Sequence, residues 1–367
     1  MTKIFTVKCS VIAYNLDFKF DAGTSRGVLK NKLTHFIQVR SDQFPTAIGI
    51  GEAGPLKGLS IDDVSDFQDK INLILRRVEK MKFRADQELL LQQIDELDLS
   101  KYPSIQFALE TALLDLIHGG KREIFQNSFF NGNLSLPING LVWMGDKGFM
   151  ERQIEQKLEQ GYDCIKMKIG AINFDQECEI LGNIRGRYSK EKITIRVDAN
   201  GAFTPDKALD KLHKLNEYDI HSIEQPIQPG LIQEMSKLCK QSPIPIALDE
   251  ELIGVCGREN RLALLESIAP QYIILKPTLL GGIVATREWV ELADQTNTGW
   301  WMTSALESNI GLNAIAQLTA ALKATLPQGL GTGQLYHNNI ESPLCISEGK
   351  LSYNVNIDWE LPDIFNQ

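Results

Sequence analysis

Polar residues recur at nearly even intervals through the middle of this 367-residue chain, each at the end of an apolar, strand-like run. The successive gaps between them are 30, 26, 25, 27 and 28 residues. This interval is typical of a strand, a loop and a return helix, the repeating unit of a (β/α) barrel, whose strands all end at one mouth where the site lies. The six residues are Lys168, Asp198, Glu224, Asp249, Lys276 and Ser304.

The pattern of strands and helices divides the chain into two parts. Residues 1–130 have strands first and helices after, an α+β pattern, and we expect them to form a capping domain. Residues 131–337 alternate strand and helix, from SLPINGLVWM to an eighth strand in GLGTGQLY. This α/β alternation predicts a (β/α) barrel of the modified TIM type, although an open doubly wound sheet would alternate in the same way. The tail, residues 338–367, is expected to return to the first domain.

Composition and charge narrow the class of protein. The hydrophobic content of 43% and the charged content of 23% are ordinary for a globular protein. A net charge of −9 argues against a nucleic-acid partner, and no apolar run approaches the ~20 residues that cross a bilayer. Six scattered cysteines without a CxxC pair favour reduced thiols and a cytoplasmic location. We therefore expect a small-molecule partner; no pattern indicates the oligomeric state.

Three consecutive strand ends carry carboxylates. Asp198, Glu224 and Asp249 should converge within a few ångströms, where unpaired carboxylates repel strongly. A divalent cation removes that conflict, and hard oxygen ligands favour Mg²⁺, with Mn²⁺ as a substitute. Any one of the three could instead be a solvated loop residue or a helix cap. Three in succession at matching positions favour a metal site.

Two strand ends carry lysines that should face each other across the mouth. Lys168 lies on the second strand and Lys276 on the sixth, half a turn apart in an eight-stranded barrel. A carboxylate substrate held by the metal would place its α-carbon between the two amines. Nearby positive charge would depress the pKa of one lysine, which could then act as a base near neutral pH. The pattern predicts removal of a proton next to a carboxylate.

Residues beside these strand ends are candidates for supporting roles. Lys166 lies on the same strand face as Lys168 and either adds positive potential beside it or forms a salt bridge with Asp198. Arg196 stands in the same relation to Asp198 and would extend a cationic wall. Asn200 either hydrogen-bonds a ligand or makes the turn in DANGAF.

As a set, these motifs resemble those of the enolase superfamily. They are KMK, DAN, EQP, DE and LKP on strands two to six, and Lys-x-Lys with a sixth-strand lysine is similar to the muconate-lactonising subgroup. The resemblance covers nearly the whole chain and implies an enolase C-terminal-like barrel with an N-terminal capping domain. It implies Mg²⁺ binding by Asp198, Glu224 and Asp249, a catalytic pair of Lys168 and Lys276, and a neighbouring acid, Glu250.

The seventh-strand segment narrows the resemblance. TSALESNIGLNAIAQLTAAL looks like the corresponding part of the o-succinylbenzoate synthase family, dehydratases of menaquinone synthesis. The resemblance implies syn elimination of water from 2-succinyl-6-hydroxy-2,4-cyclohexadiene-1-carboxylate. Lys168 would be the base and then the acid, and the Lys276 ammonium would stabilise the enediolate. The succinyl tail would lie near Ser304, Glu307, Ser308 and Gly311.

Two segments that could contact substrate could also have a purely structural role. Ser308 and Gly311 also suit a helix start, with Ser308 as the cap; both roles are compatible, because a helix N-terminus binds anions. The loop DAGTSRGVLKNK, residues 21–32, is expected to close over the mouth. Its Ser25 and Arg26 are either substrate contacts or plain surface residues.

The metal-and-lysine framework is shared by other enzymes of the subgroup, namely N-succinylamino acid racemases, dipeptide epimerases and muconate cycloisomerases. Opposed lysines suit epimerisation, since each can serve one face of the α-carbon. The seventh-strand segment favours the dehydratase, as does GTGQ on strand eight where an Asp-x-Asp would indicate dipeptide binding. An inactive barrel serving as a binding or scaffolding protein would have lost a ligand or a lysine, and all five are present.

Overall fold

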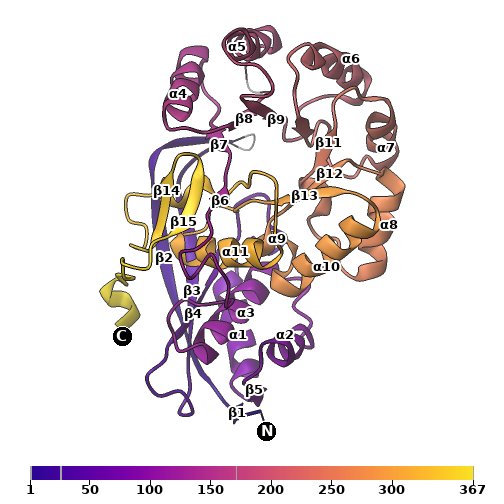
Figure 1. Cartoon of the computed structure of the whole chain (residues 1–367). Coiled ribbons are helices and arrows are strands. Elements are labelled where there is room, and N and C mark those ends of the chain that lie inside the picture. Colours follow the sequence, from indigo (N-terminus) through magenta and orange to yellow (C-terminus); the bar gives the residue numbers. More distant parts are fainter. Residues whose placement is uncertain (1, 25–26, 171, 367) are drawn as a thin grey trace.

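The computed structural model describes residues 2–24, 27–170 and 172–366, and its centre is a parallel sheet (Figure 1). Seven strands follow the order β13-β12-β11-β10-β9-β8-β7, the reverse of their order in the chain. Because parallel strands point the same way, their carboxyl ends meet at one rim. The strands are β7 (Gly140–Val142), β8 (Cys164–Lys168), β9 (Thr194–Asp198), β10 (Ser222–Glu224), β11 (Ile246–Leu248), β12 (Tyr272–Leu275) and β13 (Gly299–Met302).

Gln328 and Gly329 join the two edges of this sheet into a barrel. Gly329 N donates to Met302 O on one side (2.8 Å), and Asn139 N donates to Gln328 O on the other (2.9 Å). Parallel bridges accompany both bonds. The expected eighth strand, residues 329–336, is therefore wrong in extent: pairing is confined to residues 328–329, and Gly331–Gln334 forms a 3₁₀ helix, η2.

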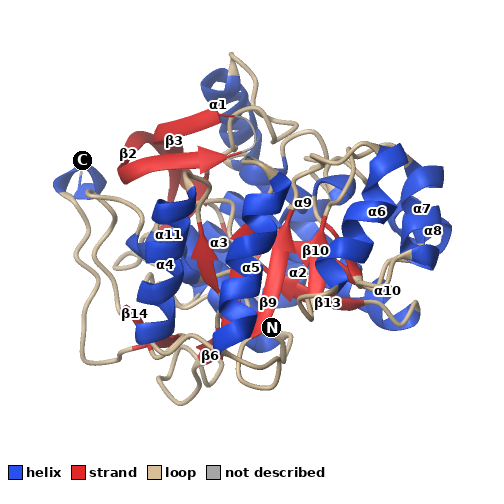
Figure 2. Ribbon diagram, turned by 90° about the horizontal axis from the view of Figure 1, so that it is seen from above, coloured by secondary structure: helices blue, strands red, loops and turns tan. Residues whose placement is uncertain are grey.

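Helices lie outside the strands, as Figures 1 and 2 show. The strands are almost wholly buried, as expected for a parallel sheet covered by helices. Among the described residues no helix is long and apolar enough to span a membrane. The helices are α4 (Lys147–Glu159), α5 (Phe174–Arg187), α6 (Pro205–Asn216), α7 (Ile232–Gln241), η1 (Glu250–Leu252), α8 (Arg258–Ile268), α9 (Pro277–Leu280), α10 (Gly282–Gln295) and α11 (Asn309–Ala321).

The N-terminal part is an antiparallel sheet, β2-β3-β4, packed against helices. Helix α3 approaches β4 so closely that a Cβ at Gly49 or Gly51 would lie 1.9 Å from a carbonyl oxygen of α3. Glycine is therefore required at both positions. The elements are β1 (Ile4–Phe5), β2 (Lys8–Thr24), β3 (Gly27–Arg40), β4 (Gly49–Ala53), α1 (Phe67–Val78), β5 (Phe83–Arg84), α2 (Gln87–Asp95) and α3 (Pro103–Ile117).

The arm formed by β2 and β3 contains a bulge. Asp17 pairs with Asn31, and the next pair is Ala22 with Leu29, so β2 advances five residues where β3 advances two. We call residues 18–21 the arm bulge. The expected loop over residues 21–32 is wrong in extent, because β2 continues to residue 24 and β3 begins at residue 27. Ser25 and Arg26 lie outside the described residues.

The C-terminal tail contacts both parts of the molecule. Strand β15 (Lys350–Tyr353) pairs with β14 (Leu344–Ser347) and with β6 (Leu136–Pro137), at the start of the barrel. Further on, in η3 (Asp363–Asn366), the ring of Phe365 packs on Phe36 of β3 at 4.9 Å. The limits 1–130 and 131–337 for the two domains stay a prediction.

Candidate active site

The strand ends bring the expected polar residues to one cavity of about 420 Å³. Lys168, Asp198 and Glu224 are the last residues of β8, β9 and β10. Asp249 and Lys276 directly follow β11 and β12. All of these except Asp249 line the cavity, together with Lys166 and Asn200, and Asp249 is paired with Lys276.

Ion pairs connect the lysines to the carboxylates. Lys166 Nζ lies 2.5 Å from Glu224 Oε2 and 3.2 Å from Asp198 Oδ2, so its salt-bridge interpretation describes the structure. Lys168 Nζ lies 3.0 Å from the same Asp198 oxygen. Lys276 pairs with Asp249. Since three other strands separate β8 from β12, Lys168 and Lys276 reach the cavity from different sides.

Asn200 links the two halves of this polar group. Its Oδ1 accepts a hydrogen bond from Lys168 Nζ (2.7 Å), and its Nδ2 donates to Glu250 Oε1 (3.0 Å). Its backbone has φ +43°, in the left-handed region that asparagine tolerates, so it also makes the expected turn. Glu250 thus orients Asn200, which in turn orients the amine of Lys168.

The electrostatics of the buried groups follow from these pairs. Burial lowers the pKa of Lys166, but the charges of Asp198 and Glu224 outweigh it and raise that pKa above its usual value. The pKa of Lys276 is also raised, since Asp249 and Glu250 outweigh burial. Both lysines are therefore held as ammonium ions, because carboxylates lie closer to them than other cations do.

The pKa values of two carboxylates in this group shift in opposite directions. Burial would raise the pKa of Asp198, but Lys166 and Lys168 lower it below its ordinary value. Burial and the charge of Asp198 raise the pKa of Glu224. Asp198 and Glu224 are therefore close enough to repel each other, and Asp198, which has Lys166 and Lys168 beside it, is held charged.

The carboxylate oxygens of Asp198, Glu224 and Asp249 are suitable ligands for a hard divalent cation. The three residues are 1%, 3% and 2% exposed, and the Lys166 ammonium already lies between two of them. Within residues 2–24, 27–170 and 172–366, no three acidic, histidine or cysteine side chains form a ready metal cage, because lysine ammonium groups lie among the oxygens. The donor set favours Mg²⁺, which prefers oxygen ligands and keeps several waters.

Arg196 lies inside the barrel and does not line the cavity. Its guanidinium stacks on Trp301 at 3.9 Å and donates to Pro327 O (2.7 Å). The expected cationic wall at the mouth therefore lacks this residue. Arg196 instead fills the barrel interior one layer below Asp198, since its side chain lies two residues earlier on the same strand face.

The seventh-strand segment is only partly in the cavity. Ser304 lines it, with Oγ 2.6 Å from Thr332 Oγ1. Glu307, Ser308 and Gly311 do not line it. Glu307 is buried and accepts a hydrogen bond from Ala305 N (2.7 Å).

Glu52 explains why the start of α11 is closed to a ligand. This buried carboxylate of β4 accepts hydrogen bonds from Ser308 N (3.0 Å), Ser308 Oγ (2.5 Å) and Gly311 N (3.0 Å). Ser308 also caps the helix through Ile310 N, as its cap interpretation proposed. The expected substrate contacts at Glu307, Ser308 and Gly311 are corrected accordingly: the protein's own carboxylate occupies this helix N-terminus.

Several cavity residues were missed by sequence reasoning. Trp143 directly follows β7, a position equivalent to that of Lys168 and the other polar strand-end residues, so the same rule could have found it. Leu306 lines the cavity with φ +62°, unusual for leucine, and its carbonyl accepts from Lys32 Nζ (3.0 Å) and Tyr336 Oη (2.7 Å). No local signal indicates these long-range partners.

Comparisons with known proteins agree with this geometry. Residues 150–354 match the family model "Enolase C-terminal domain-like". The chain is 47% identical over 363 residues to an o-succinylbenzoate synthase from Desulfotalea psychrophila (strain LSv54 / DSM 12343), covering 92% of this chain and 96% of that protein. The crystal structure of MenC from Desulfotalea psychrophila LSv54 has a TM-score of 0.85 at 42% identity, covering 95% of this chain and 99% of that one.

More distant structures share the architecture. A dipeptide epimerase from Enterococcus faecalis V583, complexed with Mg and the dipeptide L-Leu-L-Tyr, has a TM-score of 0.82 at 19% identity, with 96% of this chain and 97% of that chain covered. At that identity the likeness shows the fold alone. The family model and the Desulfotalea relative show more: the chain belongs to the o-succinylbenzoate synthase family of the enolase superfamily.

Proposed function

We propose that this chain is an o-succinylbenzoate synthase, a lyase that removes water from 2-succinyl-6-hydroxy-2,4-cyclohexadiene-1-carboxylate in menaquinone biosynthesis. The observation that carries the proposal is the 47% identity over 92% of the chain to a relative of that name. The cavity supports it, because Lys168 and Lys276 line it together with the carboxylates of Asp198 and Glu224. Mg²⁺ dependence and a cytoplasmic location are parts of the same proposal.

Asp198, Glu224 and Asp249 would hold the Mg²⁺. When bound, the cation polarises the substrate carboxylate and makes the neighbouring C–H bond more acidic. Lys166 contributes fixed positive charge beside Asp198 and Glu224, to which it is paired. These residues therefore bind and orient the carboxylate end of the substrate.

Lys168 carries the proton in both directions. Its Nζ, held by Asp198 and Asn200, accepts the proton from the α-carbon. The same amine, now protonated, returns that proton to the departing hydroxyl, so a C–H and a C–O bond break, the ring gains a double bond and one water leaves. Lys276 keeps its proton, as its raised pKa favours, and its positive charge stabilises the negative charge that develops on the carboxylate oxygens.

A direct assay tests the proposal. Purified protein is given the cyclic hydroxy acid with Mg²⁺, and formation of the aromatic product is followed by absorbance and mass spectrometry, with a chelated sample as the control. N-Succinylamino acids and dipeptides are offered separately and as competitors. Rapid, chelator-sensitive formation of o-succinylbenzoate supports the proposal; no conversion of the cyclic acid overturns it.

Racemisation of N-succinylamino acids is the second candidate. Lys168 and Lys276 reach the cavity from strands that three others separate, and this favours proton exchange on both faces of an α-carbon. In the same assay, exchange of the α-proton for deuterium, with loss of optical rotation, would reveal this activity.

A further inference from the structure

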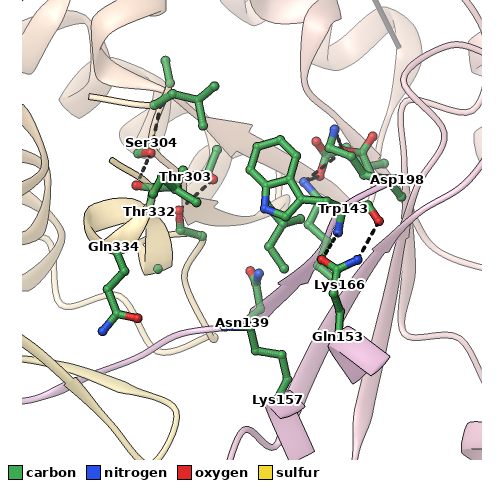
Figure 3. A pocket seen from close by; sticks show the side chains of 18 of the residues that line it. Asn139, Trp143, Gln153, Lys157, Lys166, Asp198, Thr303, Ser304, Thr332 and Gln334 are labelled. Carbon is green, nitrogen blue, oxygen red and sulfur yellow. Dashed lines mark hydrogen bonds and ion pairs between the residues drawn. The ribbon is translucent and has the colours of Figure 1, made fainter. Parts of the chain in front are cut away.

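Trp143 lies on the apolar side of the catalytic cavity. It follows the first barrel strand, and its side chain lines the same cavity as the catalytic lysines. In Figure 3 the indole is drawn between the Asp198–Lys166 group and the Ser304–Thr332 group. A ligand that contacts the lysines therefore has the indole beside it.

One side chain of α4 fixes the backbone of Trp143. Gln153 Oε1 accepts a hydrogen bond from Trp143 N (2.9 Å), and Gln153 Nε2 donates to Trp143 O (3.1 Å). An amide that binds both backbone groups of one residue sets the direction in which that residue's side chain leaves the strand. The backbone of Trp143 is thus held by α4.

The arm bulge supplies a second ring to the same wall. Phe20 packs edge-to-face on Trp143, with centroids 5.6 Å apart and planes at 69°, a geometry that aromatic pairs prefer. The bulge is itself anchored to the barrel, because Lys19 N donates to Leu335 O (2.8 Å) and the ring of Phe18 lies 4.6 Å from that of Tyr336. Bulges next to active sites re-aim side chains, and this one turns Phe20 onto Trp143.

We propose that Trp143, backed by Phe20, is the residue that selects a compact cyclic acid over an extended N-acylamino acid. This inference rests on the proposed function, because both classes of substrate would use the same lysines and carboxylates. Aliphatic side chains complete the wall on either side of the indole. They are Leu56, Leu59, Leu141, Leu306 and Leu335.

Shape gives the physical reason for the selection. The cyclic acid is compact and its diene carbons are apolar, so this part of the ring can pack on the indole while the carboxylate meets the polar side of the cavity. An N-acylamino acid carries an open-chain side chain on its α-carbon, and this side chain would need the volume that the indole fills. Replacing the indole by a methyl group removes the first contact and opens that volume.

The test compares two reactions in one set of variants. Trp143→Ala, Trp143→Phe and wild type are assayed for dehydration of the cyclic acid and for deuterium exchange at the α-carbon of N-succinylamino acids with small and large side chains. The matched control is Trp359→Ala, since Trp359 lies in the tail, bonds to Tyr353 and does not line the cavity. Circular dichroism and thermal unfolding check that each variant is folded.

We expect Trp143→Ala to lower the ratio of kcat/KM for the cyclic acid to kcat/KM for exchange by about 10- to 200-fold, the range of single apolar contacts in enzyme pockets. Trp143→Phe should keep most of the ratio, and Trp359→Ala all of it. Equal losses in both reactions for Trp143→Ala would overturn the inference, as would an unchanged ratio.

Two further experiments distinguish a failure of this inference from a variant that does not fold and from a failure of the proposed function. If Trp143→Ala does not fold, Phe20→Ala tests the same wall from its half-buried outer ring, and it should lower the ratio in the same direction. An unchanged ratio in a folded Phe20→Ala would then count against the wall. If wild type dehydrates nothing, the proposed function fails; the change in exchange caused by Trp143→Ala, measured for large against small side chains, still decides the role of the indole.

Discussion

The two sides of the catalytic cavity are built in different ways. On the polar side, each functional residue ends a parallel strand or directly follows one, from Lys168 to Lys276. On the apolar side Trp143 also follows a strand, but most of the residues around it come from the arm bulge, from loops and from contacts between segments far apart in sequence, such as Phe20 with Trp143. The polar side is therefore a product of the barrel itself, whereas the apolar side depends on how the N-terminal part docks onto it.

This difference suggests separate roles for the two sides: the polar side carries out the chemistry, and the apolar side selects the substrate. Residues on strand ends keep their spacing as long as the barrel keeps its register, so the proton-transfer groups suit a whole superfamily of reactions. Residues carried by a docked arm can change without disturbing the barrel. We infer that substitutions on the polar side change the rate of chemistry, while those on the apolar side change substrate preference or stability.

The largest expected effect is that of Lys168→Ala. Removing the group that carries the proton should lower kcat by about 10²- to 10⁴-fold, the usual contribution of general acid–base catalysis. The fold should persist, since Asp198 keeps its pair with Lys166. Steady-state kinetics and circular dichroism check both statements, with the exposed Lys207→Ala as a control. Near-normal turnover in Lys168→Ala would remove its assigned role.

The second largest effect on activity is expected for Asp249→Asn. It replaces one charged oxygen of the proposed cation site and frees Lys276 from its ion pair. We expect the Mg²⁺ concentration for half-maximal activity to rise by about 10- to 100-fold or more, by analogy with losses of supporting groups around metals. Activity measured against Mg²⁺ concentration tests this, and Asp206→Asn, an exposed residue of α6, is the control. An unchanged profile would contradict the ligand assignment.

Glu52→Gln probes the link between the apolar side and the docked N-terminal part. One of the two carboxylate oxygens that bind Ser308 and Gly311 becomes an NH₂ group, so a buried donor faces another donor. We expect a loss of about 1–3 kcal/mol in the free energy of unfolding, measured with urea, and a higher KM with a smaller change in kcat. A selective loss of kcat would instead place Glu52 with the chemistry.

Glu110 offers a docking contact away from the cavity, and its effect depends on pH. This carboxyl of α3 accepts a hydrogen bond from Ile283 N at the start of α10, and burial raises its pKa from 4.5 to about 8. The folded protein therefore holds the proton more tightly than the unfolded chain, so stability should fall as the pH rises from about 4.5 to 8, by at most about 1.4 kcal/mol per pH unit.

Glu110→Gln should flatten that slope. Urea unfolding at several pH values compares it with wild type, while kcat and KM at neutral pH should stay unchanged because Glu110 does not line the cavity. An equal slope in both proteins would show that another group controls the pH dependence. A changed KM would show that docking at α10 also reaches the substrate.

The sequence allowed the polar side to be predicted, and physical reasons explain why the rest was missed. Asp198 and Lys276 were found because strand periodicity and carboxyl ends are local properties. The role of Glu52 depends on a partner more than 250 residues away, and nothing near GEAGPLKGLS indicates it. The loop expected over residues 21–32 is shorter than predicted. The arm bulge was not predicted, because strand pairing that switches to residues 335–336 leaves no periodic pattern.

The pairing of the tail has a consequence for how the chain acquires its structure. Strand β6 at residues 136–137 pairs with β15, and Phe36 packs on Phe365. In both cases the second partner lies more than 200 residues later in the chain and is synthesised last. Neither the β14-β15-β6 sheet nor the packing around Phe36 of the N-terminal sheet is complete until those late segments have been synthesised. We therefore expect slow folding dominated by closure of long loops, and an aggregation-prone intermediate that chaperones would shield.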